Sequence, residues 1–365
     1  MEASVELRHV TKQYDDVNAV NDVSLQIRHG EFFSLLGPSG CGKTTTLRLV
    51  AGFEQPTRGE ILINNQDVSD KRPYERNVNT VFQNYALFPH LTVAGNIRFG
   101  LERQKTPKGK INGLVQEALD LVQMNAMGDR YPRQLSGGQQ QRIALARSLV
   151  LRPEVLLLDE PLGALDLKLR KAMQLELKNL QEKVGITFIY VTHDQEEALT
   201  MSDRIAVMAE GRLEQVGPPE EIYDFPKTRF VADFIGVSNF FSGQIADMND
   251  QQIRVKTDGG LDVVLPPHPD RVKGKHIHFS IRPEKISINA AAGAEAASFE
   301  NQYTGRILNR MYLGDSIHYI IALSEEERIT VFLKQRASGR QQISYAKGDN
   351  VQVSWHRDSA VILMD

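Results

Sequence analysis

One glycine-rich stretch decides the fold of this chain: Gly37-Pro38-Ser39-Gly40-Cys41-Gly42-Lys43-Thr44-Thr45. An apolar run at 31–36 precedes it and indicates a buried strand, and a helical pattern at 46–51 follows it. A glycine loop between a strand and a helix is the context of a phosphate-binding loop. Its backbone N–H groups and the helix N-terminus attract phosphate oxygens. We therefore expect residues 39–45 to bind a nucleotide, with Lys43 at the β- and γ-phosphates and Thr44 as a ligand of Mg²⁺.

Length and composition bound the class of protein. The 365 residues are long for one domain and suggest two. Lys+Arg 43 against Asp+Glu 46 gives a net charge of −3, so we expect no nucleic-acid partner. No apolar run approaches the roughly 20 residues of a membrane helix, and we expect no signal peptide at the acidic N-terminus. The only cysteine, Cys41, excludes an internal disulfide, which fits the cytosol.

The order of hydrophobic patterns predicts an α/β domain over 1–236. Strand patterns alternate with helical ones, which is typical of a mainly parallel sheet covered by helices. A helical insertion is expected at about 84–151, and the basic tract 105–110, broken by Pro107 and Gly109, predicts an exposed loop. The expected strands are 5–10, 23–27, 31–36, 59–64, 78–83, 155–160, 186–191, 204–208 and 212–216, and further helices are expected at 165–184 and 195–201.

The remaining residues, 237–365, predict an all-β domain. Short strand patterns are separated by Gly, Pro and Asp, and they contain a weak internal repeat. Gly243-Gln244-Ile245 opens one half and Gly305-Arg306-Ile307 opens the other, and 274–281 shares its spacing with 348–355. This repetition predicts a duplicated small β-barrel, with the small residues of 290–298 as a connector between the halves.

Two carboxylates follow the predicted strand at 155–158. Asp159 suits a water-mediated bond to Mg²⁺, and Glu160 suits the general base that polarises an attacking water. A single carboxylate at this place could be only a helix cap. The catalytic interpretation therefore depends on the pair of carboxylates occurring in a chain that also has a phosphate-binding loop.

Of three further candidates, two stand at the ends of predicted strands, and Tyr14 lies between the predicted strands 5–10 and 23–27. His193 is suited to hold the base, the water and the γ-phosphate in register, although a lone His here is also common in turns. Gln83 is suited to complete the Mg²⁺ shell or to position water, and its alternative is an ordinary exposed glutamine. Tyr14 is suited to stack on a base, and its alternative is a half-buried strand residue.

A second glycine-rich segment, Leu135-Ser136-Gly137-Gly138-Gln139, precedes a predicted helix at 140–150. A Ser hydroxyl and glycine amides at a helix N-terminus make a phosphate cradle. The alternative is a Ser N-cap followed by flexible glycines. Because the first loop already contacts one side of the γ-phosphate, we expect this second cradle to close over the nucleotide of another copy of the chain.

Together these motifs resemble the nucleotide-binding subunit of an ATP-binding cassette (ABC) transporter over about residues 5–236. The resemblance implies that 37–44 is the Walker A loop and 155–159 the Walker B strand, and it implies two cofactors, ATP and Mg²⁺. Gly163 departs from the Ser of many relatives, which we expect to soften coupling between subunits. The other implied roles are the Q-loop for Gln83, the signature for 135–139, the catalytic base for Glu160, the D-loop for Leu165-Asp166, the switch histidine for His193 and the adenine-stacking aromatic for Tyr14.

The C-terminal part resembles the accessory oligonucleotide-fold (TOBE) barrel of importer ATPases for maltose, sulfate and polyamines. Ile281-Arg282-Pro283-Glu284 carries that similarity, and the segments 163–170 and 185–188 are most similar to spermidine/putrescine importer ATPases. Sulfate, a sugar, ferric iron or another solute are the alternatives. The resemblance implies a peripheral ATPase on the cytoplasmic face of the cell membrane. It implies three kinds of partner: a second copy, two transmembrane permease subunits, and an extracellular or periplasmic solute-binding protein.

Two other classes of ABC protein fit less well. A soluble one acting in DNA repair or translation would carry two cassettes or a long coiled coil, and a purely regulatory one would not need Glu160 beside Asp159. Two hypotheses concern local chemistry. Cys41 lies beside Lys43 near a helix N-terminus, both of which favour a thiolate, and the equally weighted alternative is an inert small residue. The apolar segment 85–93, in which Pro89 argues against a continuous helix, forms either a groove for a permease helix or part of the core.

Overall fold

The computed structural model describes residues 3–163, 165–268, 274–290, 299–335 and 344–364. The chain divides into two compact units, Met1–Ile222 and Tyr223–Asp365. This division precedes the boundary expected near residue 236. The reason is that Arg282 of the second unit donates hydrogen bonds to the carbonyls of Tyr223, Ala232 and Val237 and so ties this segment to that unit.

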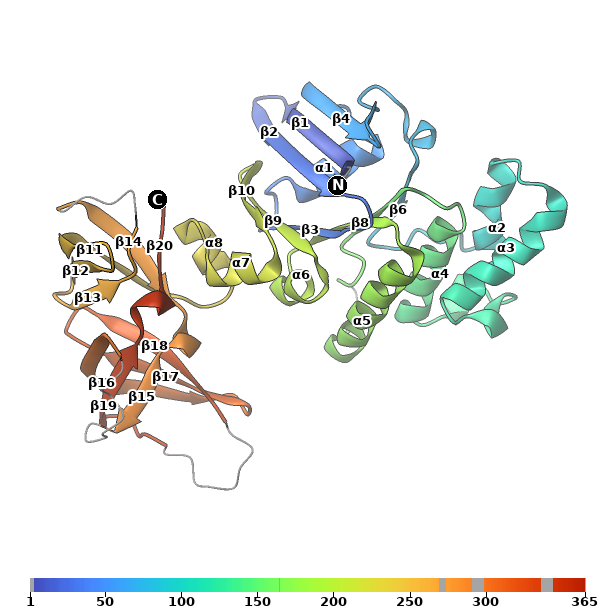
Figure 1. The fold of residues 1–365 in the computed structure, drawn as a ribbon. Coiled ribbons are helices and arrows are strands. Elements are labelled where there is room, and N and C mark those ends of the chain that lie inside the picture. The colour runs from blue at the N-terminus through green and yellow to red at the C-terminus, as the bar shows by residue number, and fades with distance from the viewer. Residues whose placement is uncertain (1–2, 164, 269–273, 291–298, 336–343, 365) are drawn as a thin grey trace. The chain divides into compact units, whose positions relative to one another are not determined.

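The first unit is built on a mostly parallel sheet with the strand order β10-β9-β3-β8-β7-β6 (Figure 1). Only β10 pairs antiparallel within this sheet. The central strands are apolar and buried along almost their whole length, as expected of strands covered on both faces. The strands are β3 (Phe32–Leu36), β6 (Val78–Val81), β7 (Val155–Asp159), β8 (Thr187–Thr192), β9 (Arg204–Ala209) and β10 (Arg212–Gly217).

A second, antiparallel sheet has the order β2-β1-β4-β5, and helix α1 (Lys43–Ala51) lies between the two sheets (Figure 1). One apolar core joins these three layers, with Leu25 from the antiparallel sheet, Leu47 from α1 and Leu157 from β7. This packing fixes the N-terminus of α1 against the parallel sheet. The strands of the second sheet are β1 (Ala3–Tyr14), β2 (Val17–Arg28), β4 (Arg58–Ile63) and β5 (Gln66–Asp67).

Helices α4 (Gly137–Leu149), α5 (Leu167–Val184) and α6 (Gln195–Met201) pack on the other side of the parallel sheet. With α2 (Val93–Arg103) and α3 (Lys108–Leu121), α4 also forms a separate helical core. The expected loop at 105–110 is therefore partly wrong. Pro107 is the N-cap of α3, because its fixed φ and missing N–H suit a helix start rather than a continuing loop. Short 3₁₀ turns are η1 (Pro73–Glu75), η2 (Asn125–Met127) and η3 (Pro132–Gln134).

The second unit contains two antiparallel sheets with matching internal order, β13-β12-β11-β14-β20 and β18-β17-β16-β19-β15. The last strand of each half joins the sheet of the other half, since β15 pairs with β19 and β20 pairs with β14. The predicted β-rich domain with an internal duplication is thus present, around one apolar core that contains Phe279, Tyr319 and Trp355. The connector expected at 290–298 lies almost entirely outside the described residues.

The bounds in this part of the chain are α7 (Pro219–Asp224), α8 (Arg229–Phe234), β11 (Asn239–Met248), β12 (Ile253–Thr257), β13 (Asp262–Leu265), β14 (His276–Ile281), η4 (Pro283–Lys285), β15 (Ser287–Ala290), β16 (Asn301–Tyr312), β17 (Ser316–Ala322), β18 (Arg328–Lys334), β19 (Asn350–Trp355), η6 (Arg357–Ser359) and β20 (Ala360–Ile362). Across the described part of both units, no helix combines the length and apolarity needed to cross a membrane.

Candidate nucleotide site

The glycine loop connects β3 to α1, and its glycines are required by geometry. Gly42 has a φ of 103°, and a Cβ there would lie 2.3 Å from the carbonyl oxygen of Ala19. A Cβ at Gly37 would lie 2.3 Å from the carbonyl oxygen of Met208. The loop is therefore pressed between β2 and the end of β9, and any side chain at these two positions would displace it.

Lys43 and Thr44 open helix α1 and connect the loop to its surroundings. The Lys43 Nζ donates to the carbonyl oxygens of Gly37 and Pro38, each at 2.8 Å, so the ammonium lies within the loop. The Thr44 Oγ1 donates to Asp159 Oδ1 at 3.2 Å. Burial raises the pKa of Asp159 above its usual range, and the bond from Thr44 partly opposes that rise. The structure thus places two of the three predicted Mg²⁺ ligands, Thr44 and Asp159, beside each other.

Cys41 does not have the environment that its sequence neighbours suggest. Its side chain is only 3% exposed and belongs to the apolar core between the sheets. Burial raises the pKa of the thiol, and Lys43, whose Nζ lies 3.8 Å from the sulfur, offsets only part of that rise. The hypothesis of a favoured thiolate is therefore wrong, because desolvation outweighs the nearby positive charge.

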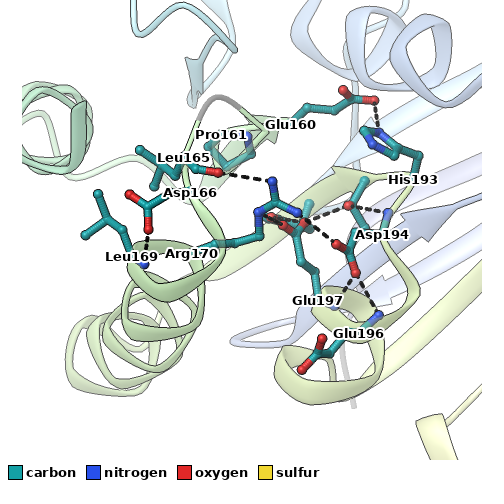
Figure 2. Close-up of polar contacts among 12 residues, drawn as sticks. Glu160, Pro161, Leu165, Asp166, Leu169, Arg170, His193, Asp194, Glu196 and Glu197 are labelled. Atoms are coloured by element: carbon teal, nitrogen blue, oxygen red, sulfur yellow. Dashed lines mark hydrogen bonds and ion pairs between the residues drawn. The ribbon is translucent and has the colours of Figure 1, made fainter. Parts of the chain in front are cut away.

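The carboxyl ends of β7 and β8 bring the predicted catalytic side chains together (Figure 2). His193 Nδ1 lies 3.3 Å from Glu160 Oε1, and Gln83 Nε2 lies 3.5 Å from Glu160 Oε2. Glu160 adopts a φ of 45°, which is rare for a residue with a side chain, and its N–H donates to Val191 O. Strained backbone of this kind concentrates at functional sites. The adjacent strands thus gather Asp159, Glu160 and His193, with Gln83 nearby.

Ser136 is the N-cap of α4 and forms a capping box with Gln139. Gln139 Oε1 accepts from Ser136 N at 2.9 Å, and Ser136 Oγ accepts from Gln139 N at 3.4 Å. A Cβ at Gly137 would lie 3.2 Å from Leu165 Cδ2, so this glycine permits close packing on the segment after β7. Among the described residues, no hydrogen bond or ion pair joins 136–139 to 37–45. The structural role as a cap is therefore present, and the second phosphate cradle stays a prediction.

Tyr14 stands at the end of β1 with its side chain 42% exposed. The Lys12 Nζ lies 4.9 Å from the centre of its ring, and burial together with a hydrogen bond to Glu54 raises the pKa of its hydroxyl. Part of the Tyr14 ring is exposed, and the ammonium group of Lys12 lies over it. Tyr14 is thus a strand residue whose ring is partly exposed, and its role in stacking on adenine stays a prediction.

A groove of about 520 Å³ lies beside the segment after β6. The sequence did not indicate which residues line it. Phe88 lines it and packs against Phe99, with ring centres 4.6 Å apart, and the Arg147 guanidinium lies 5.4 Å from the Phe88 ring. Arg147 also donates to the carbonyls of Tyr85 and Ala86. The sequence did not predict this role of Arg147, because an isolated Arg in a helical pattern does not indicate which loop it will contact.

Comparison with known proteins identifies the family of the chain. The family model "ABC transporter" matches residues 20–163, and the model "TOBE domain" matches 279–363. A spermidine/putrescine import ATP-binding protein of Rubrobacter xylanophilus is 51% identical over 362 residues, covering 99% of this chain and 93% of that protein. The protein of the same name from a Nostoc species is 54% identical over 329 residues, covering 90% and 86%.

Solved structures with this fold include cbiO1 from Clostridium perfringens, part of an ABC transporter complex, with a TM-score of 0.57 and 30% identity over 61% of this chain and 91% of that one. They also include a dimeric ATP-binding cassette in a post-hydrolysis state bound to ADP and Pi, with a TM-score of 0.52 and 34% identity over 59% of this chain and 98% of that one. The near full-length matches show that the chain belongs to the ABC transporter family, as an ATP-hydrolysing subunit with a C-terminal TOBE domain.

Proposed function

We propose that two copies of the chain hydrolyse ATP at two shared sites and so power the import of a polyamine through partner permease subunits. The observation that carries this proposal is the gathering of Thr44, Asp159, Glu160 and His193 at one edge of the parallel sheet, next to the glycine loop. Phosphoryl transfer depends mainly on positioning and on stabilising negative charge. A rigid sheet edge that presents these groups supplies the positioning.

Each residue then has a distinct role. Glu160 accepts a proton from the attacking water, and His193, with Nδ1 3.3 Å from the carboxylate, holds the base in register with the γ-phosphate. Lys43 and the loop amides bind the phosphates, and Tyr14 stacks on the adenine. Gln83, 3.5 Å from Glu160, positions the water or completes the metal shell.

The oxygen atoms of Thr44 and Asp159 fit Mg²⁺, which prefers oxygen ligands and is usually held by one or two protein groups together with substrate phosphates. Within the described parts of the chain, no cluster of three or more His, Cys, Asp or Glu residues is placed to hold a metal by itself. That agrees with an ion shared with the nucleotide. When bound, Mg²⁺ neutralises charge on the β- and γ-phosphates.

The dimer accounts for the second glycine-rich segment. Ser136 and the glycines after it lie at the N-terminus of α4, where backbone N–H groups attract anions. An isologous dimer makes each contact twice, so the Ser136 segment of each copy closes over the nucleotide bound by the other. The dimeric cassette among the similar structures supports the formation of a dimer.

The groove at Phe88 is the proposed site for a helix of the permease. Of the apolar segment at 85–93, Tyr85 is buried in the core, whereas Phe88 faces the groove together with Phe82 and Phe99. One part of the segment therefore belongs to the core, and another part lines the groove proposed for the permease helix. Its position directly after Gln83 connects a bound permease helix to the nucleotide site.

A polyamine is the proposed solute because the similar import proteins are named for spermidine and putrescine. In this role the chain is peripheral on the cytoplasmic face of the membrane, and a binding protein outside delivers the solute. The test is uptake by proteoliposomes that contain the chain with its permease and binding protein. We expect internal ATP to drive uptake of labelled spermidine, and Glu160→Gln to abolish it. Uptake of sulfate, maltose or ferric iron without spermidine would overturn the choice of solute.

A further inference from the structure

We propose that Arg170 is a positioning residue that locks together the two loops carrying Glu160 and His193 (Figure 2). This inference rests on the proposed catalytic roles of those two residues. Arg170 lies in the first turn of α5, and its guanidinium is turned toward both loops. Three of its nitrogen atoms face three different groups, which lie on the two loops and on the helix that follows the second loop.

The first contact is to the loop that leads from β7 into α5. Arg170 Nη2 donates to the carbonyl oxygen of Leu165 at 3.1 Å. The next residue, Asp166, caps α5 by accepting from Leu169 N at 3.0 Å. The end of this loop is therefore held twice to the first turn of α5, and its position is coupled to the position of the Arg170 side chain.

The second contact is to the loop that leads from β8 into α6. Arg170 Nη1 donates to Asp194 Oδ2 at 3.2 Å. The other carboxylate oxygen of Asp194 caps α6 by accepting from the N–H groups of Glu196 and Glu197. Asp194 directly follows His193, so this bond fixes the backbone that carries the histidine.

The third contact is to a buried carboxylate. Glu197 is 3% exposed, and its Oε2 accepts from the hydroxyls of Tyr190 and Thr192, both at 2.6 Å. Its Oε1 lies 3.8 Å from Arg170 Nε. Burial raises the pKa of Glu197, and these hydroxyls and Arg170 oppose the rise. Glu197, held by hydroxyls at the carboxyl end of β8, thus faces the guanidinium as an ion-pair partner without a hydrogen bond to it.

An arginine is needed for this geometry. Its guanidinium presents several N–H groups in one rigid plane, whereas a lysine is a single point charge on a flexible stem. Only the planar group reaches Leu165 O, Asp194 and Glu197 together. Loss of the plane removes the link between the later parts of the two loops, and the bond from Glu160 N to Val191 O then remains to support the 3.3 Å approach of His193 to Glu160.

A purely structural role for Arg170, as the partner of a buried charge, makes different predictions. In the double variant Arg170→Met with Glu197→Gln, no buried carboxylate is left unpaired, so folding is protected while the loop contacts are lost. Glu197→Gln alone is the background variant, since it keeps the bonds of Arg170 to Leu165 and Asp194. Lys171→Met is the matched control, because Lys171 Nζ makes a 2.7 Å ion pair to Glu196 between the same two helices without contacting either loop.

The assay is steady-state ATP hydrolysis by the full chain over a range of Mg-ATP concentrations, with thermal unfolding of each variant. Misplacement of reacting groups by about 1 Å can cost about 10²-fold in rate, so we expect a fall in kcat of that size for the double variant. We expect its KM for ATP to stay within about two-fold, because the phosphate-binding loop is untouched. Arg170→Lys should give an intermediate kcat, and Glu197→Gln and Lys171→Met should remain near wild type.

Two results would overturn the inference: a double variant whose kcat matches that of Lys171→Met, or a loss of kcat that follows the loss of folded protein. Wild-type hydrolysis by Glu160→Gln would be a different failure. It would refute the proposed role of Glu160 itself, whatever Arg170 does.

Discussion

Replacing Glu160 by Gln is the sharpest perturbation of the proposed chemistry. The amide has nearly the same shape as the carboxylate, so the unusual backbone at φ 45° and the packing beside His193 and Gln83 should persist. What is lost is the ability to accept a proton. General-base catalysis contributes about 10²–10⁴-fold, which corresponds to roughly 2.7–5.4 kcal/mol of activation free energy at 1.36 kcal/mol per decade.

The assay is phosphate release by the purified full chain at saturating Mg-ATP, combined with equilibrium binding of ATP. We expect the variant to bind ATP as tightly as wild type, since Lys43 and the glycine loop are unchanged, and to accumulate as a dimer in light scattering. Glu196→Gln, an exposed carboxylate on α6, is the control and should hydrolyse normally. Hydrolysis by Glu160→Gln at the rate of that control would exclude Glu160 as the general base, and lost ATP binding would show that Glu160 acts in binding instead.

Three further outcomes follow from the structure. Because Cys41 is buried and its pKa is raised, maleimide should label it slowly in the folded protein and quickly after unfolding; rapid labelling of folded protein would contradict its placement. Phe88→Ala should keep ATP hydrolysis by the isolated subunit and lose solute uptake in the assembled importer, whereas misfolding of the subunit would indicate a core role. Burial raises the pKa of Asp159 in the folded protein, so the folded protein loses stability as pH rises and this carboxyl group ionises. Without nucleotide, Asp159→Asn should therefore raise the melting temperature more at pH 7 than at pH 4. An equal rise at both pH values would contradict a raised pKa of Asp159.

Much of the fold could be predicted from local patterns. The buried runs of β3, β7 and β8 are apolar throughout, and the glycine loop between a strand and a helix has few other uses. The duplication of the C-terminal strands is also visible in the sequence, because Gly243 and Gly305 open two halves with the same strand pairing. Patterns of this kind are visible because each depends on neighbouring residues only.

The features that were missed or wrong depend on contacts between distant segments. Lys43 is close to Cys41 in sequence and suggests a thiolate, but the burial that reverses the conclusion comes from two sheets packing around α1. Arg170 stands in an amphipathic helix rich in charge, where nothing local distinguishes it from a solvent-facing arginine. Its partners Asp194 and Glu197 are reached only when β7 and β8 pair.

The structure divides the two units at Ile222, before the expected boundary at residue 236, for a similar reason. The short helix α8 continues the helical character of the first domain, yet Arg282 binds the carbonyls on either side of it from a strand end far along the chain. The hydropathy pattern of a sequence does not reveal a hydrogen bond between such distant residues.

The most direct test of the shared site is a cross-link between its two halves. In a chain with Cys41→Ala and Glu160→Gln, we would install Ser39→Cys in the glycine loop and Ser136→Cys at the N-cap of α4. A disulfide needs Cα atoms no more than about 7 Å apart, so it reports whether the two cradles meet on one nucleotide. We expect a covalent dimer on a non-reducing gel under mild oxidation with Mg-ATP, and none with ADP. A cross-link within a single chain, or no dimer with ATP even in the assembled importer, would contradict a nucleotide site shared between two copies.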